Sequence, residues 1–97
     1  MDDNTKLILL YDYYGELLTD KQKSYFEDYY FNNLSLSEIS EENNVSRSAV
    51  QKQLKDIEEK LTNYEESLKI IDRNKKIENL LEKLDDVELK DKISKLL

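Results

Sequence analysis

The chain contains no proline and only one glycine, Gly15, among its 97 residues. Proline and glycine are the residues that most often interrupt helices, so a chain that nearly lacks them can remain helical over most of its length. Its length is typical of one small domain, and charged residues make up 38% of it. The sequence therefore predicts an all-α fold, in which residues 1–72 and a helical tail of residues 73–97 form a single domain.

The residue types that are missing exclude most catalytic sites. The chain has no cysteine and no histidine, so the metal clusters and the nucleophilic catalysis that need these side chains are ruled out. One glycine cannot build a phosphate-binding loop. Adjacent acids such as Glu58 and Glu59 point about 100° apart on a helix and do not converge on one ion. We expect no enzymatic activity, no catalytic residue, no metal, no cofactor and no small-molecule substrate.

The same composition bears on the location of the protein. The absence of cysteine suits a reducing compartment. The N-terminus reads Met-Asp-Asp and lacks the basic region and apolar run of a secretory signal. The longest unbroken apolar stretch, Leu7 to Tyr11, is far shorter than the roughly 20 residues of a membrane span. These features predict a cytoplasmic protein without membrane insertion.

Local signals place the first two helices. Apolar residues recur at helical spacing over residues 5–18, with Asp3 or Asn4 as the candidate N-cap. Thr19 and Gln22 then form a capping-box sequence, in which each side chain can bind a free backbone N–H of the other residue. This box predicts that a second helix starts there and runs to about residue 31.

A helix-turn-helix is predicted over residues 36–55. Ser35 and Glu38 form a second capping box, which starts a short helix that ends near residue 43. Asn44 stands where a left-handed residue ends a helix, and asparagine tolerates that conformation. Ser46 is the N-cap of the next helix. Two helices joined by a turn of about three residues have the form of a DNA-binding helix-turn-helix, whose second helix enters the major groove.

The helix that begins at Arg47 is predicted to continue to about residue 72. From Val50 onwards, its apolar residues alternate spacings of four and three, which is the heptad pattern of helices that wind together. The predicted dimer or partner seam consists of Leu54, Ile57, Leu61, Tyr64, Leu68 and Ile71. The seam could bind a second copy, pack on helices of its own chain, or receive a partner's helix. We predict a homodimer that uses it.

Two further short helices are predicted in the tail. Ile77 to Leu84 has helical apolar spacing, and Asp85-Asp86 breaks the pattern, with Asp86 as a possible N-cap. Apolar spacing resumes from Leu89 to the last residue. Residues 73–97 are thus expected to form a helical pair.

A candidate nucleic-acid-binding surface lies at the start of the long helix, opposite Val50 and Leu54. Its polar residues are Ser46, Arg47, Ser48, Gln51, Lys52 and Lys55. Arginine and lysine suit guanine or phosphate, glutamine suits adenine, and serine suits phosphate. The overall charge of −7 opposes phosphate, however, and residues 19–45 carry two lysines against six acids. We therefore expect any binding to double-stranded DNA to be weak and salt-dependent.

The order of the motifs resembles a known family. The matching segments are Leu18-Thr19-Asp20-Lys21-Gln22, Tyr29-Tyr30, Leu36 to Glu42, and Val45 to Val50. Together they resemble the YlxM-type family, small bacterial proteins linked to the signal recognition particle, and the wider motif is similar to region 4 of sigma factors. The likeness covers about residues 5–70. Asn43 and Asn44 depart from it, because the family has an apolar residue and a glycine there.

The resemblance implies an all-α fold, similar to sigma region 4, with a long helix after the helix-turn-helix. It also implies a regulatory or adaptor role in co-translational protein targeting, through the particle's GTPase or its RNA. A sequence-specific DNA-binding transcriptional regulator is the alternative function. A structural dimer with a relict motif is the third.

Overall fold

A computed structural model describes residues 3–97, which form six α helices and no strand. The α helices are α1 (Asp3–Tyr14), α2 (Asp20–Tyr30), α3 (Leu36–Asn43), α4 (Arg47–Leu68), α5 (Ile70–Glu82) and α6 (Val87–Ser94), and a 3-10 turn, η1 (Gly15–Leu17), follows α1. The predicted all-α fold is confirmed. None of the helices in this part of the chain is long and apolar enough to cross a bilayer.

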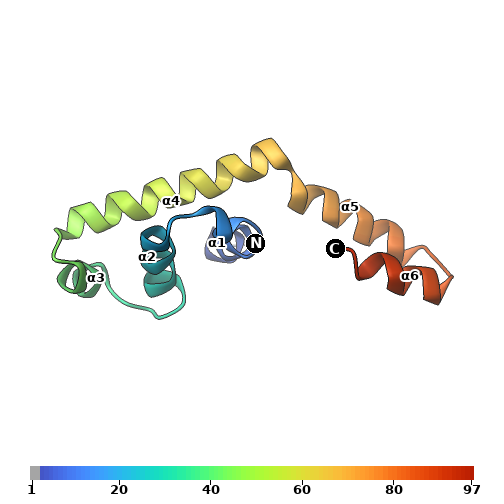
Figure 1. Ribbon diagram of the computed structural model, residues 1–97, viewed down its shortest axis with the longest axis horizontal. Helices are drawn as coiled ribbons and strands as arrows, with labels where there is room; N and C mark the ends of the chain where they lie inside the picture. The colour runs from blue at the N-terminus through green and yellow to red at the C-terminus, as the bar shows by residue number, and fades with distance from the viewer. Residues whose placement is uncertain (1–2) are drawn as a thin grey trace.

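The helices form two parts of different build (Figure 1). Helices α1, α2 and α3 lie in a row against one side of α4, and we call these four helices the α1–α4 unit. Beyond the end of α4 the chain bends into α5, and α6 folds back beside α5. This α5–α6 hairpin makes the molecule elongated, at 56 × 25 × 24 Å.

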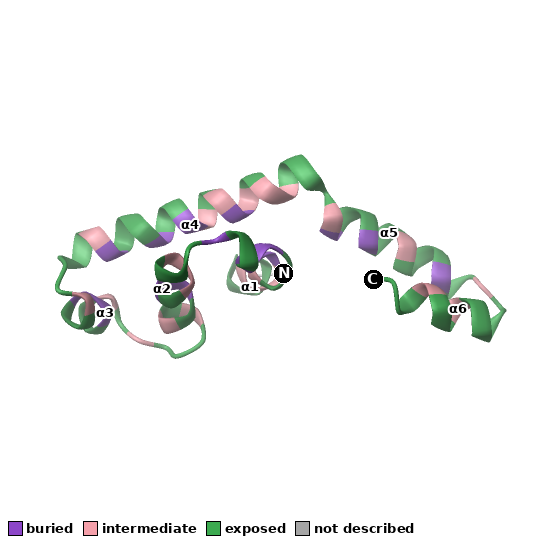
Figure 2. Cartoon of the chain, in the orientation of Figure 1, coloured by how far each residue is buried: buried purple, intermediate pink, exposed green. Residues whose placement is uncertain are grey.

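The hydrophobic core lies between α4 and the three shorter helices (Figure 2). Phe26, Ile39, Val50, Ile57 and Leu61 have no exposed surface. The ring of Phe26 stacks on that of Tyr11 with centroids 4.3 Å apart. Because the three short helices cross α4 at successive points, each covers a different stretch of its apolar stripe.

The predicted seam is therefore used mainly inside the protein's own core. Leu54, Ile57 and Leu61 are at most 5% exposed and belong to the core of the α1–α4 unit. Tyr64 is partly buried and packs against this core, and the centroids of the Tyr64 and Tyr14 rings lie 6.0 Å apart. Leu68 is 52% exposed, and Ile71 is buried on α5. Over Leu54, Ile57 and Leu61 the heptad spacing thus marks a packing surface that α1, α2 and α3 cover.

The prediction of one unbroken helix to residue 72 is wrong, because α4 ends at Leu68. Lys69 adopts a left-handed backbone with φ of 53°, and α5 begins at the next residue. The free N–H groups at the start of α5 are bound by side chains. The Glu65 carboxylate accepts hydrogen bonds from the N–H groups of Ile71 (3.0 Å) and Asp72 (3.2 Å). These bonds replace the helical partners that the bend removes.

A hydroxyl of α1 completes this junction. Tyr14, 1% exposed, donates its hydroxyl proton to the Glu65 carboxylate and accepts a hydrogen bond from the Ile70 N–H at 3.2 Å. Nearby, the Asn74 amide of α5 donates to the Tyr13 hydroxyl at 3.2 Å. The bend between α4 and α5 is thus fixed by contacts that come from a distant part of the chain.

The first helix is also shorter than predicted. It ends at Tyr14, and a 3-10 turn closes with a bond from the Leu18 N–H to the Gly15 carbonyl at 3.0 Å. A Cβ at Gly15 would lie 3.1 Å from the Tyr11 ring, so glycine lets that ring lie close against the backbone. The candidate caps, Asp3 and Asn4, lie inside the helix instead of before it.

The remaining start signals are confirmed. Thr19 with Gln22, and Ser35 with Glu38, form complete capping boxes. The Asp86 side chain accepts a hydrogen bond from the Leu89 N–H at 3.0 Å at the start of α6.

Candidate nucleic-acid interface

The predicted turn between α3 and α4 is confirmed and is held by local hydrogen bonds. Asn44 has φ of 54°, in the left-handed region. Its N–H donates to the Glu41 carbonyl (3.4 Å), and the Val45 N–H donates to the Ser40 carbonyl (3.1 Å). This pair of bonds is the Schellman pattern that ends helices. The Ser46 hydroxyl then accepts from the Ala49 N–H at 3.1 Å and caps α4.

Asn43, where the sequence departs from the family, anchors the turn. Its amide donates to the Ile39 carbonyl at 2.7 Å, and its side-chain oxygen accepts from the Lys21 ammonium at 2.6 Å. Lys21 lies on α2, so this contact ties the turn to a second helix. The role of Lys21 could not be read from the sequence, because 22 residues separate the partners.

All the predicted contact residues are exposed on the first turns of α4 and its cap. They are Ser46, Arg47, Ser48, Gln51, Lys52 and Lys55. Val50 and Leu54 point into the core between them, at 0% and 5% exposure, so the helix is held by one face and presents the other. The Ser46 and Ser48 hydroxyls lie 3.2 Å apart. The structure thus brings the six side chains together on one exposed surface.

A groove that the sequence did not reveal borders this surface. It has a volume of about 390 Å³ and lies between α2, the start of α3, and α4. Gln51 and Lys55 line it together with Tyr29, Tyr30 and Glu58. The Tyr30 hydroxyl donates to the Glu58 carboxylate, and burial together with this bond raises the pKa of Tyr30. The phenol therefore stays a neutral donor at physiological pH.

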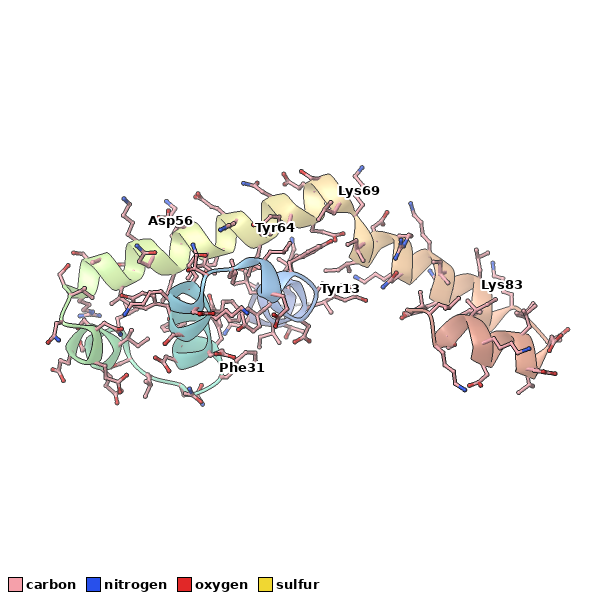
Figure 3. All side chains as sticks on the ribbon, in the orientation of Figure 1. Tyr13, Phe31, Asp56, Tyr64, Lys69 and Lys83 are labelled. Atoms are coloured by element: carbon pink, nitrogen blue, oxygen red, sulfur yellow. The ribbon has the colours of Figure 1, made fainter. Side chains whose placement is uncertain are left out.

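The positive charge of the surface is confined to a short strip. Arg47, Lys52 and Lys55 supply it within residues 46–55, and the next charged residue is Asp56. Asp56 points outward from α4, away from α1 and α2 (Figure 3). Glu58 and Glu59 follow it on the same helix. Acidic side chains thus limit how far a phosphate backbone can follow α4.

Comparison with known proteins settles the family. Residues 1–97 match the family described as "Putative helix-turn-helix protein, YlxM / p13 like". The chain belongs to this family. Similar members include a UPF0122 protein from Thermoanaerobacter sp., 48% identical over 83 residues, which covers 86% of this chain and 71% of that protein. One from Listeria innocua is 43% identical over 84 residues, covering 87% and 76%. One from Malacoplasma penetrans is 51% identical over 71 residues, covering 73% and 66%.

Membership in a helix-turn-helix family agrees with the geometry of α3 and α4. Both helices have the caps, the left-handed turn residue and the buried inner faces that the motif needs. The family is named for the same motif that the residues themselves predict.

Proposed function

We propose that this protein is a non-enzymatic regulator that binds double-stranded DNA by placing the start of α4 in the major groove. The observation that carries the proposal is the second helix of a capped helix-turn-helix, whose polar side chains are exposed while its opposite side is fully buried. A helix held in this way presents its side chains to base edges without having to become ordered on binding.

The side chains divide into two roles. Arg47 and Gln51, which are four residues apart and so share one side of α4, suit direct contact with guanine and adenine. Lys52 and Lys55 suit phosphate contacts, as do the Ser46 and Ser48 hydroxyls. Base contacts give sequence preference, and phosphate contacts give affinity.

The acidic residues around this surface limit the expected affinity for duplex DNA. With about three cations facing phosphate, the logarithm of the affinity should fall with the logarithm of salt concentration with a slope of about −2 to −3. Binding should therefore be detectable at low ionic strength and weak at physiological salt.

Fluorescence anisotropy of a labelled pool of random duplexes, titrated with protein at two salt concentrations, tests the proposal. Lys52→Ala should weaken binding to all sequences and reduce the salt slope by about one. Arg47→Ala should relax the preference among selected sequences. Lys92→Ala is the control, since Lys92 is also exposed but lies on α6. Duplex binding that is absent at low salt, or unaffected by Lys52→Ala and Arg47→Ala, would refute the proposal.

We propose an adaptor role in the signal recognition particle pathway as the second candidate. The net charge of −7 favours it, because an acidic surface suits a protein partner better than a nucleic acid. The same titration, made in parallel with the particle's RNA and its GTPase, separates the two candidates. Saturable binding to either one, with none to duplex DNA, would support the adaptor.

A further inference from the structure

The α5–α6 hairpin has an apolar surface that is largely open to solvent. Leu80, Leu89 and Leu96 are 67%, 45% and 83% exposed. None of the residues Val87–Ser94 of α6 is buried. A helix of eight residues is marginal in water on its own and gains most of its stability from packing. The hairpin therefore lacks the second layer that covers α4.

We propose that this surface binds the same surface of a second copy of the chain. The two hairpins would pack about a two-fold axis as a four-helix bundle. The contact would be made by Leu80 of α5, Leu84 of the connection that follows it, Leu89 of α6 and Leu96 just after α6. Two-fold pairing is the commonest symmetry of soluble oligomers, and it lets one apolar patch cover itself. The α1–α4 unit of each copy stays outside the contact.

The distribution of charge favours a second copy as the occupant. Residues 70–97 carry seven basic and seven acidic residues, whereas residues 3–69 carry eight basic and fourteen acidic ones. Two α1–α4 units repel each other, but two hairpins are close to neutral. The signs also alternate along the hairpin, with ion pairs Lys92–Glu88 and Lys95–Asp91 on α6. A strongly acidic or strongly basic partner would find no matching field on this surface.

The position of the hairpin permits this contact. The start of α5 packs on α1, and the rest of the hairpin projects from one end of the elongated molecule, away from α1, α2 and α3 (Figure 3). A second hairpin can approach it without displacing any packed element. The interaction would also leave Arg47 and Lys52, at the opposite end of the molecule, exposed in both copies.

This interface differs from a dimer built on the seam of α4. Leu54, Ile57 and Leu61 are already covered by the chain's own helices, which leaves Leu68 as the one strongly exposed leucine of that seam. Leu68 and Leu17 are each 52% exposed and lie outside the hairpin. They therefore provide matched controls for an exposed leucine on the hairpin.

The first test measures the mass of the full chain in solution by light scattering over a range of concentrations. We expect the mass to approach twice 11.6 kDa, and the double variant Leu80→Glu with Leu96→Glu to raise the dissociation constant at least tenfold. Leu68→Glu and Leu17→Glu should leave it unchanged. Wild-type protein that remains monomeric up to about 1 mM would overturn the proposal, since an interface that weak contributes only about 4 kcal/mol. Dissociation caused by Leu68→Glu, or an unchanged mass in the double variant, would overturn it as well.

The second test detects the contact by cross-linking and does not require a variant that disrupts it. Because the chain has no cysteine, Leu80→Cys and Leu17→Cys each create a single reactive thiol. With a short bismaleimide, Leu80→Cys should give cross-linked dimer at concentrations where Leu17→Cys stays monomeric. Equal yields from the two variants would contradict the hairpin contact. Circular dichroism of each variant establishes that helix content is retained.

Discussion

The α1–α4 unit and the α5–α6 hairpin are both amphipathic helices rich in leucine, lysine and glutamate, yet they differ in what covers their apolar sides. In the first, Ile57 and Leu61 of α4 are completely buried by α1, α2 and α3. In the second, Leu81 is buried but its neighbour Leu80 is 67% exposed. Helix propensity is similar in both parts, so the stability of each depends on the packing that its apolar stripe receives.

The comparison also shows where the two parts are joined. The start of α5 packs on α1, and hydrogen bonds with Tyr13, Tyr14 and Glu65 hold it there. Hydrogen bonds require particular distances and angles, so they fix the direction in which α5 leaves α4. Apolar contacts have no such directional requirement. The angle of the hairpin thus depends on a few polar groups.

The largest expected difference in the free energy of unfolding comes from truncating one leucine to alanine in each part. Leu61→Ala should lower the free energy of unfolding by about 2–5 kcal/mol, because it leaves a cavity in a closed core. Leu80→Ala should cost less than about 0.5 kcal/mol in the monomer, since its side chain is mostly exposed. Urea denaturation followed by circular dichroism measures both at a low protein concentration. Equal costs would mean that the hairpin is packed as well as the α1–α4 unit.

The next largest effect is expected from substitutions at the junction between α4 and α5. Glu65→Ala should lower the free energy of unfolding by about 1–3 kcal/mol, because it leaves the Tyr14 hydroxyl and the first N–H groups of α5 without their acceptor. Tyr14→Phe removes only one hydroxyl and should cost about 1 kcal/mol. Amide hydrogen exchange should show faster exchange at Ile71 and Asp72 in Glu65→Ala, with Val50 to Leu61 changed much less. Equal acceleration along α4 would contradict a local role.

A pH titration examines the same group without changing the sequence. Burial by itself would raise the pKa of Glu65, but the hydrogen bonds from Tyr14, Ile71 and Asp72 outweigh it and hold the pKa below its usual value of 4.5. Because the pKa is lower in the folded protein, the ionised carboxylate stabilises the fold above pH 4.5, and this contribution is lost as the pH falls through the folded value. Unfolding measured from pH 7 to pH 3 should therefore show a steeper loss in wild type than in Glu65→Gln. Parallel curves would refute this linkage.

The smallest effect concerns the bend. Lys69 has a positive φ that costs a non-glycine residue about 1–2 kcal/mol. Lys69→Gly should relieve this strain and raise the free energy of unfolding by up to about 1 kcal/mol. Asn44→Gly, at a similar φ of 54°, should gain less, because asparagine already tolerates this conformation. A thermal melt of both variants measures the difference. A loss of stability in Lys69→Gly would mean that the lysine side chain itself stabilises the bend.

Local sequence signals could predict most of the helix boundaries. The capping boxes at Thr19 and Ser35 and the caps at Ser46 and Asp86 each depend on residues three positions apart, so they can be read directly. Asn44 was predicted as the left-handed turn residue for the same reason. The six polar residues at the start of α4 follow from the helical period, since the core side of that helix fixes the exposed one.

Contacts between distant residues could not be predicted in this way. Tyr14 and Glu65 are 51 residues apart, and Lys21 and Asn43 are 22 apart, so no spacing rule connects them. The end of α4 at Leu68 lies beside the first of these pairs, which no local signal reveals. Without it, the unbroken apolar period from Leu54 to Ile71 indicates one long helix.

The sequence by itself determined that the chain is helical, where most helices begin, and which side of each is apolar, because these properties depend on neighbours within one or two turns. Only the tertiary structure decided what covers each apolar side. In the folded chain, α1, α2 and α3 cover the core part of the α4 seam, and the chain bends at Lys69. The apolar side chains of the α5–α6 hairpin remain largely exposed. The physical reason is that an apolar stripe specifies burial but carries no information about the partner, which depends on how the whole chain folds.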